Sequence, residues 1–173
     1  MPKKPPVSEL EFLKLSGNHA ELTRKLAVLG CETPDISRYA AHVCKAWFGL
    51  GEAHLDESKK LIVAECPRAA YSRAYYAAYN ASKGVRYMSH GYVSLKGDDH
   101  GRASTELPAD FPDVATWVAK ISILYEQRLR ADYDNWSSSA DEFTISAAQA
   151  IDDANAFVDA ARLYLNTKYR LKL

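Results

Sequence analysis

The chain has 173 residues, of which 22 are Lys or Arg and 22 are Asp or Glu, so its formal net charge is zero. This length suits one domain, and the balanced charge excludes the overall basic surface of a dedicated nucleic-acid-binding protein while leaving room for a local basic patch. The three cysteines form no CxxC pair, which fits a reducing compartment, and no run of about 18 apolar residues occurs. We therefore expect a cytoplasmic protein without membrane contact.

Residues 1–36 are predicted to form an N-terminal extension that is partly disordered and then helical. Three prolines among the first six residues disfavour a helix at the start, and Ser8 with Glu11 forms a capping-box pattern where order should begin. Leucines then recur at helical spacing, with an interruption near residues 16–18. This helical part is expected to end at Gly30.

A long helix is predicted from Asp35 or Ser37 onward, because apolar residues recur there every three or four positions. Gly49 and Gly51 lie within it, and a glycine costs about 1 kcal/mol relative to alanine in a helix. We therefore expect a kink or a break midway. Pro67 then begins the next helix, since proline fits the first helical position.

The stretch of residues 67–88, PRAAYSRAYYAAYNASKGVRYM, carries three different faces on one helix. Its alanines fall on one side and allow another helix to approach closely, and the alanine-rich residues 147–161 are the expected partner. Its tyrosines form a second stripe, which composition favours as core residues whose hydroxyl groups are hydrogen-bonded at the rim. Arg73 and Asn80 share a third, polar edge.

Residues 89–112 are predicted to be the least regular part of the chain, because they include three glycines and two prolines. One short helix is expected there, at about residues 100–107. Asp113 should then cap an amphipathic helix, in which apolar residues recur at spacings of three and four as far as residues 128–134.

The last helix is predicted to begin after Ser139 and Glu142, which form a second capping box. Its apolar seam starts at Phe143 and continues to about Tyr169. No stretch has the alternation of a strand pair. The predicted fold is therefore all-α, an up-and-down bundle of four or five helices over residues 37–173 with the N-terminal extension before it.

The histidines and cysteines do not match a metal site. His42 and Cys44 are two residues apart, which separates them by about 200° on a helix, and the other histidines lack an HxxxH or ExxH partner. Neither a GxSxG motif nor a phosphate-binding glycine loop occurs. We expect neither a metal ion nor another cofactor.

Three polar clusters remain as candidate sites. They are Arg68, Arg73 and Arg86 with the nearby tyrosines; Asp98, Asp99, His100 and Arg102; and Arg128, Arg130, Asp132, Tyr133 and Asp134. The third cluster has two interpretations. It is either a functional site or a helix end, at which Glu126 and Arg130 pair at i,i+4 and cations complement the helix dipole.

Two segments of the chain, taken in order, resemble the HEPN domain family. They are SRAYYAAYNASKG (residues 72–84) and YEQRLRADYD (residues 125–134), with DDHGRASTEL between them and an alanine-rich last helix after them. The likeness is closest to the branch whose members read roughly SRAYYAMFHAA, then HSG, then LRxxADYD. It covers about residues 40–165.

The resemblance implies a helical bundle that commonly forms a symmetric homodimer, with polar helix ends meeting across a cleft. Many members are RNA-directed toxins or RNA-binding modules, often encoded with a minimal nucleotidyltransferase partner. Catalytic members carry an arginine followed after four to six residues by a histidine, and this pair acts on the RNA 2′-hydroxyl and the scissile phosphate. The arginine corresponds to Arg128, but the residue five positions later is Tyr133, and no histidine follows His100.

Tyrosine, with an ordinary pKa of about 10, is a poor general base at neutral pH. We therefore expect a catalytically weak or inactive module that contacts RNA, a nucleotide or a partner protein in a toxin–antitoxin or defence-type system. Its expected binding residues are Arg73, Asn80, Arg128, Arg130 and Asp132. The alternative is a metal-independent endoribonuclease toxin in which Arg128 acts with His100 or Tyr133. A structural adaptor with solvated charges is a third hypothesis.

Overall fold

The computed structural model describes residues 17–28, 33–95, 97–134 and 143–173. Within these ranges the chain contains no β-strand, and one isolated bridge joins Asn18 to Tyr92. The predicted all-α bundle is confirmed. The helices are α2 (His19–Val28), α3 (Thr33–Val63), α4 (Pro67–His90), α5 (Asp99–Thr105), α6 (Val114–Tyr133) and α7 (Ala147–Tyr169).

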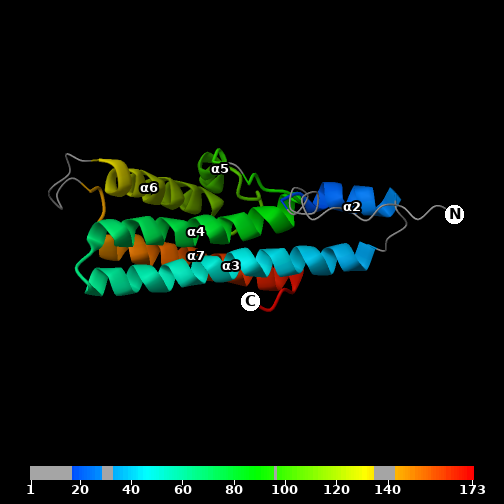
Figure 1. Cartoon of the computed structure of the whole chain (residues 1–173), viewed down its shortest axis with the longest axis horizontal. Helices are drawn as coiled ribbons and strands as arrows, with labels where there is room; N and C mark the ends of the chain where they lie inside the picture. Colours follow the sequence, from blue (N-terminus) through cyan, green and yellow to red (C-terminus); the bar gives the residue numbers. More distant parts are fainter. Residues whose placement is uncertain (1–16, 29–32, 96, 135–142) are drawn as a thin grey trace.

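Helix α4 is the central element of the bundle. It packs most extensively against α3 and then against α7 and α6, while α5 covers part of α4 and α6. Figure 1 shows α4 running between α6 on one side and the α3 and α7 pair on the other. Every helix in the described ranges is too short or too polar to cross a lipid bilayer.

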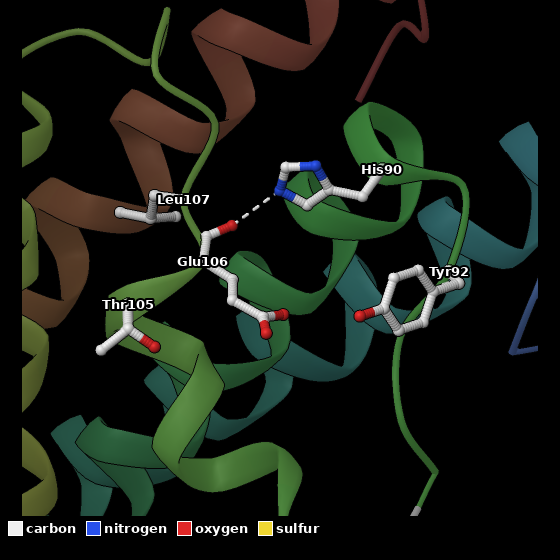
Figure 2. Close-up of a pocket in the computed structure, with 5 residues that line it drawn as sticks. All are labelled: His90, Tyr92, Thr105, Glu106 and Leu107. Carbon is white, nitrogen blue, oxygen red and sulfur yellow. Dashed lines mark hydrogen bonds between the residues drawn. The ribbon is translucent and has the colours of Figure 1, made fainter.

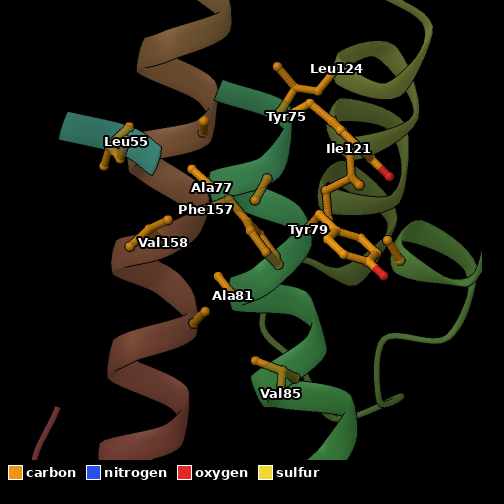
Figure 3. Packing of buried hydrophobic residues seen from close by; sticks show 14 of the residues in the cluster. Leu55, Tyr75, Ala77, Tyr79, Ala81, Val85, Ile121, Leu124, Phe157 and Val158 are labelled. Atoms are coloured by element: carbon orange, nitrogen blue, oxygen red, sulfur yellow. The ribbon is translucent and has the colours of Figure 1, made fainter. Parts of the chain in front are cut away.

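The alanine face of α4 explains this central position. Its members Ala70, Ala74, Ala77, Ala78 and Ala81 have no solvent-exposed surface. Figure 3 shows Ala77 and Ala81 on the side of α4 that faces α7, with Phe157 of α7 between the two helices, so the predicted pairing of the two alanine-rich helices is confirmed. The same small side chains let α3 approach α4 closely.

The prediction of a break in α3 is wrong, because α3 is one helix of 31 residues. Gly51 faces α4, and a Cβ atom built on it would lie 3.0 Å from the backbone oxygen of Ala77 and 3.5 Å from Cβ of Asn80. Gly49 has open space at the corresponding position. The absence of a side chain at Gly51 thus serves close helix packing rather than a kink.

The start of α7 and the residue that caps it differ from the prediction. Ser146 caps this helix, its hydroxyl accepting a hydrogen bond from the backbone nitrogen of Gln149 at 3.1 Å, so Phe143 precedes the helix instead of lying in its seam. The ring of Phe143 stacks on that of Tyr71 with centroids 4.4 Å apart. This stacking partly buries an apolar residue that the predicted helix seam had included. The predicted capping box at residues 139–142 lies outside the described residues.

Other helix starts also depart from the predicted caps. Asp113 does precede α6, but its backbone is left-handed (φ 50°) and its side chain makes no capping hydrogen bond. Asn18 caps α2 by accepting a hydrogen bond from the backbone nitrogen of Glu21 at 2.9 Å. Helix α3 begins at Thr33, so the expected domain boundary after residue 36 falls inside it. The expectations for residues 1–16 and 29–32 lie outside the described residues.

Valine substitutions at the two α3 glycines should have opposite consequences. Gly51→Val places a branched side chain against the backbone of α4, and we expect it to lower the free energy of unfolding by about 1–3 kcal/mol, the usual cost of overpacking. Gly49→Val is the matched control, with similar helix propensity but open space, and should leave stability unchanged or slightly raised. Urea unfolding followed by circular dichroism measures both, and equal effects would contradict the packing role of Gly51.

Candidate functional site

Three helices each bring a polar or aromatic side chain to Tyr76 of α4. His54 comes from α3 and His100 from α5, with ring centroids 5.6 Å and 5.9 Å from that of Tyr76. Arg128 comes from α6 and donates a hydrogen bond from Nη2 to Tyr76 Oη at 3.0 Å. We call this constellation the Tyr76 site, and it comprises His54, Tyr76, His100, Arg128, Asp132 and Tyr133.

Arg128 is held from several sides. Its Nη2 also donates to Tyr133 Oη at 3.3 Å, and its guanidinium carbon lies 5.5 Å and 5.1 Å from the ring centroids of Tyr76 and Tyr133, within cation–π range. Nε lies 2.8 Å from Asp132 Oδ2, an ion pair one helical turn apart in which the N–H does not align as a hydrogen bond. Arg128 is therefore buried but remains charged and oriented.

His100 lies within a set of aromatic rings. Its Nδ1 is 2.9 Å from Tyr75 Oη, and its ring stacks on Tyr79 at 4.5 Å and lies nearly parallel to Tyr125 at 6.1 Å. Burial, assisted by the positive charge of Arg128, lowers the pKa of His100. Tyr75 and Tyr79 are themselves buried, which confirms their predicted place in the core.

A buried ion pair holds α5, and with it His100, against α4. The guanidinium of Arg86 donates two hydrogen bonds to the carboxylate of Asp99, at 2.9 Å and 2.8 Å, and both residues are almost fully buried. Ser82 adds a hydrogen bond to the backbone oxygen of Ala103 at 2.6 Å. Burial alone would raise the pKa of Asp99, but the hydrogen bonds and charge of Arg86 outweigh it, so the pKa is lowered.

His54 was missed by the sequence analysis. Its Nδ1 lies 3.3 Å from Glu57 Oε2 and 3.3 Å from Nη1 of Arg73, and Arg73 Nε lies 3.2 Å from the same carboxylate oxygen. The spacing of His54 and Glu57 is the i,i+3 spacing of one helix face, which is a visible local signal. Its approach to Tyr76 depends on how α3 packs on α4, which no local pattern specifies.

The predicted binding residues only partly come together. Arg128 and Asp132 are paired in the site, and Arg73 reaches it through its contact with His54. Asn80 is buried and donates to the backbone oxygen of Tyr76 at 2.8 Å within its own helix, so it does not project into the site. Arg130 is exposed, and its position two residues after Arg128 places it about 200° round the helix.

The first predicted arginine cluster separates into different roles. Arg68 donates to the backbone oxygens of Arg130, Ala131 and Asp134 at 3.1, 2.9 and 2.6 Å, so α4 supplies a cation at the carboxyl end of α6. Arg86 belongs to the buried pair with Asp99, while Arg73 lies at the surface. These arginines shared a helix in the sequence but do not share a site.

Two open pockets lie elsewhere on the surface. One, of about 380 Å³, lies where α4 and α5 end, and Figure 2 shows His90 donating a hydrogen bond from Nε2 to the backbone oxygen of Glu106 at 2.8 Å beside it. The other, of about 370 Å³, lies on α3 beside Lys59 and Lys60. Neither pocket includes a predicted site residue. Across the described ranges, no group of three or more His, Cys, Asp or Glu side chains is arranged to hold a metal ion.

Comparison of the sequence with models of known protein families gave no match, and comparison with curated proteins gave none either. The resemblance to HEPN domains thus depends on the motifs in residues 72–84 and 125–134. The geometry of the Tyr76 site adds an independent description of what these motifs bring together.

The buried pair of Arg86 and Asp99 should behave as a unit. Asp99→Leu leaves the Arg86 charge buried without its partner, and we expect unfolding free energy to fall by about 3–5 kcal/mol. The double variant Arg86→Met, Asp99→Leu removes both charges and should recover much of that loss. Because the pKa of Asp99 is lowered in the folded state, the pair contributes fully above the unfolded pKa of about 4, and its contribution is lost as the pH falls through the folded-state value.

Urea unfolding at neutral and acidic pH measures both effects in the wild type and the two variants. Acidification should destabilise the wild type more than the double variant, which lacks this carboxylate. A double variant as unstable as Asp99→Leu, with the same acid sensitivity as the wild type, would contradict this account.

Proposed function

We propose that this chain is a HEPN-like module that binds single-stranded RNA at the Tyr76 site and has a regulatory role in a toxin–antitoxin or defence-type system. The observation that carries the proposal is the position of Arg128, whose guanidinium lies against the rings of both Tyr76 and Tyr133. Binding sites for single strands combine cations that contact phosphates with aromatic rings on which bases stack. Both kinds of group meet here.

Tyr133 is the natural stacking platform because its residue surface is 70% exposed beside Arg128. Stacking of a base on an aromatic ring is worth about 1–3 kcal/mol. The exposed side chain of Arg73 reaches the site through His54 and adds a cation for a neighbouring phosphate. Arg130 lies about 200° round α6 from Arg128, so we assign it no phosphate contact at this site. Phosphate contacts of this kind weaken with salt, because RNA binding releases counterions.

Asp132 competes with an anionic ligand for Arg128. Its carboxylate forms an ion pair with Arg128, with Oδ2 2.8 Å from Nε, and also accepts a hydrogen bond from Ser72 Oγ at 3.3 Å. A phosphate that binds Arg128 must replace this carboxylate or tolerate its negative charge. Asp132 therefore acts as an internal competitor, which orients Arg128 in the free protein and opposes an anionic ligand.

The resemblance to HEPN domains supports further parts of the proposal. It supports a symmetric homodimer and a nucleotidyltransferase-type partner protein, while the three cysteines without a CxxC pair support a cytoplasmic location. The absence of the motif histidine after Arg128 supports a module whose main role is binding. Nucleotides share the phosphate and base chemistry of RNA and are expected to compete for the site.

A second candidate function is that of a metal-independent endoribonuclease. The specific observation that favours it is the imidazole of His100, held by Tyr75 at the Tyr76 site and subject to the charge of Arg128. Arg128 would stabilise the charge that develops on the phosphate, and His100 would transfer a proton. Tyr133 contacts Arg128, but a phenol is a weaker choice than an imidazole for proton transfer at neutral pH.

Two variants, one that removes a positive charge from the site and one that removes a negative charge, test the binding proposal. We expect Arg128→Gln to weaken binding of a fluorescein-labelled, mixed-sequence single-stranded RNA and to reduce its salt slope by about 0.7, the loss of one phosphate contact. Asp132→Asn removes the competing charge and should tighten binding. Fluorescence anisotropy over a range of salt concentrations measures both, with circular dichroism to verify folding.

Arg162→Gln is the matched control, since Arg162 is a cation of α7 that pairs with Glu52 of α3 at 2.8 Å, outside the Tyr76 site. It should leave affinity and salt slope unchanged. Weaker binding in all three variants, or no change in Arg128→Gln and Asp132→Asn, would contradict RNA binding at this site.

The proposed homodimer is tested by light scattering of the purified chain. We expect a molar mass twice that of the sequence at micromolar concentration. A monomer under these conditions would contradict the shared cleft that the HEPN resemblance implies, while leaving the Tyr76 site within one chain intact.

A further inference from the structure

Two imidazoles approach Tyr76 from different helices. His54 of α3 and His100 of α5 both lie within ring-contact distance of Tyr76, at 5.6 Å and 5.9 Å between centroids. Tyr76 Oη accepts its hydrogen bond from Arg128, which leaves its own hydrogen to donate. The two imidazoles, which can transfer protons, and the guanidinium of Arg128 therefore all lie around the ring and hydroxyl of Tyr76.

The two imidazoles are oriented by their Nδ1 atoms. Nδ1 of His54 lies beside Glu57, and Nδ1 of His100 lies beside Tyr75 Oη. Nη1 of Arg73 also lies 3.3 Å from Nδ1 of His54 and can only donate to it. In the tautomer in which Nδ1–H of His54 donates to Glu57 and that of His100 donates to Tyr75, Nε2 of each ring is the nitrogen that exchanges a proton. No residue in the described part of the chain hydrogen-bonds to Nε2 of His54 or of His100.

The exposure of His54 suits contact with a ligand. Its side chain is 15% exposed, so it is fixed by packing but not sealed from solvent. The neighbouring Arg73 side chain is 44% exposed. Burial lowers the pKa of His100, which favours the neutral imidazole, the form that accepts a proton.

We propose that His54 is a second catalytic residue, which acts with His100 as an acid–base pair in slow RNA cleavage at the Tyr76 site. This inference rests on the endoribonuclease candidate above. In this proposal His54, on α3, takes the role of the histidine that catalytic HEPN domains carry shortly after the arginine and that this chain lacks after Arg128.

The reaction needs no co-reactant beyond the RNA. Neutral His100 takes the proton from a ribose 2′-hydroxyl, whose oxygen attacks the adjacent phosphorus. The bond from phosphorus to the 5′-oxygen breaks, and protonated His54 gives its proton to that oxygen. Arg128 and the Tyr76 hydroxyl stabilise the charge on the phosphate oxygens. The products carry a 2′,3′-cyclic phosphate and a 5′-hydroxyl, and the proton transferred to His100 returns to His54 through solvent.

The experiment incubates the full chain, in the presence of EDTA, with two probes, a fluorescein-labelled mixed-sequence single-stranded RNA and bulk transfer RNA. We expect cleavage with cyclic-phosphate ends and none of a DNA strand of the same sequence, which lacks the attacking hydroxyl. His54→Gln and His100→Gln should each lower the single-turnover rate by about 10²–10⁴-fold, the usual contribution of a general acid or base. RNA affinity should stay within about twofold, because neither variant removes a phosphate contact.

His42→Gln is the matched control, since His42 is an exposed histidine on the same helix as His54. It should cleave at the wild-type rate. Cleavage that is lost in His100→Gln but kept in His54→Gln would overturn the assignment of His54 and leave the endoribonuclease candidate standing. No cleavage of either probe by the wild type would overturn both, whereas the binding proposal is decided separately by the anisotropy of Arg128→Gln and Asp132→Asn.

Discussion

The close approach of α3 to α4 is the constraint on which the Tyr76 site depends. With Gly51 against the backbone of Ala77, the two helices lie near enough for His54, one turn further along α3, to reach Tyr76. A larger residue at Gly51 would move α3 outward and withdraw His54 while leaving Arg128 on α6 in place. The small residues of α4 therefore do more than fill a core, because they set the distances between side chains of different helices.

The second structural requirement is the buried pair of Arg86 and Asp99. Helix α5 has seven residues and makes few contacts with the rest of the bundle, so short-range packing alone would hold it weakly. The two hydrogen bonds from Arg86 fix Asp99, and the next residue in the chain is His100. The buried pair of Arg86 and Asp99, although costly to bury, therefore positions the imidazole of His100 among the tyrosines of α4.

The sequence predicted the elements of this fold better than it predicted their contacts. Helical periodicity and the alanine pattern were enough to identify α4 and its pairing with α7, because both signals are local. The role of Gly51 depended on tertiary packing, which overrides propensity. The α7 cap was a local signal, because Ser146 and Gln149 also have the spacing of a capping box. His54 escaped notice for the same reason as Gly51. Its contact with Tyr76 joins residues of different helices, and the family motif directed attention to the positions after Arg128.

Three arginines in and around the Tyr76 site are each paired with a carboxylate, in keeping with the zero net charge of the chain. Arg128 faces Asp132, Arg73 faces Glu57, and Arg86 is bonded to Asp99. Each pair keeps a cation oriented in the free protein. In the binding that we propose, a phosphate would displace the carboxylate of Asp132 or Glu57, and that displacement sets a cost. Because its charges are paired, such a site produces no long-range positive potential, and it cannot be detected from the composition of the chain. The anion binding that we propose for this site rests on its geometry, on the exposed ring of Tyr133 and on the donors of Arg128.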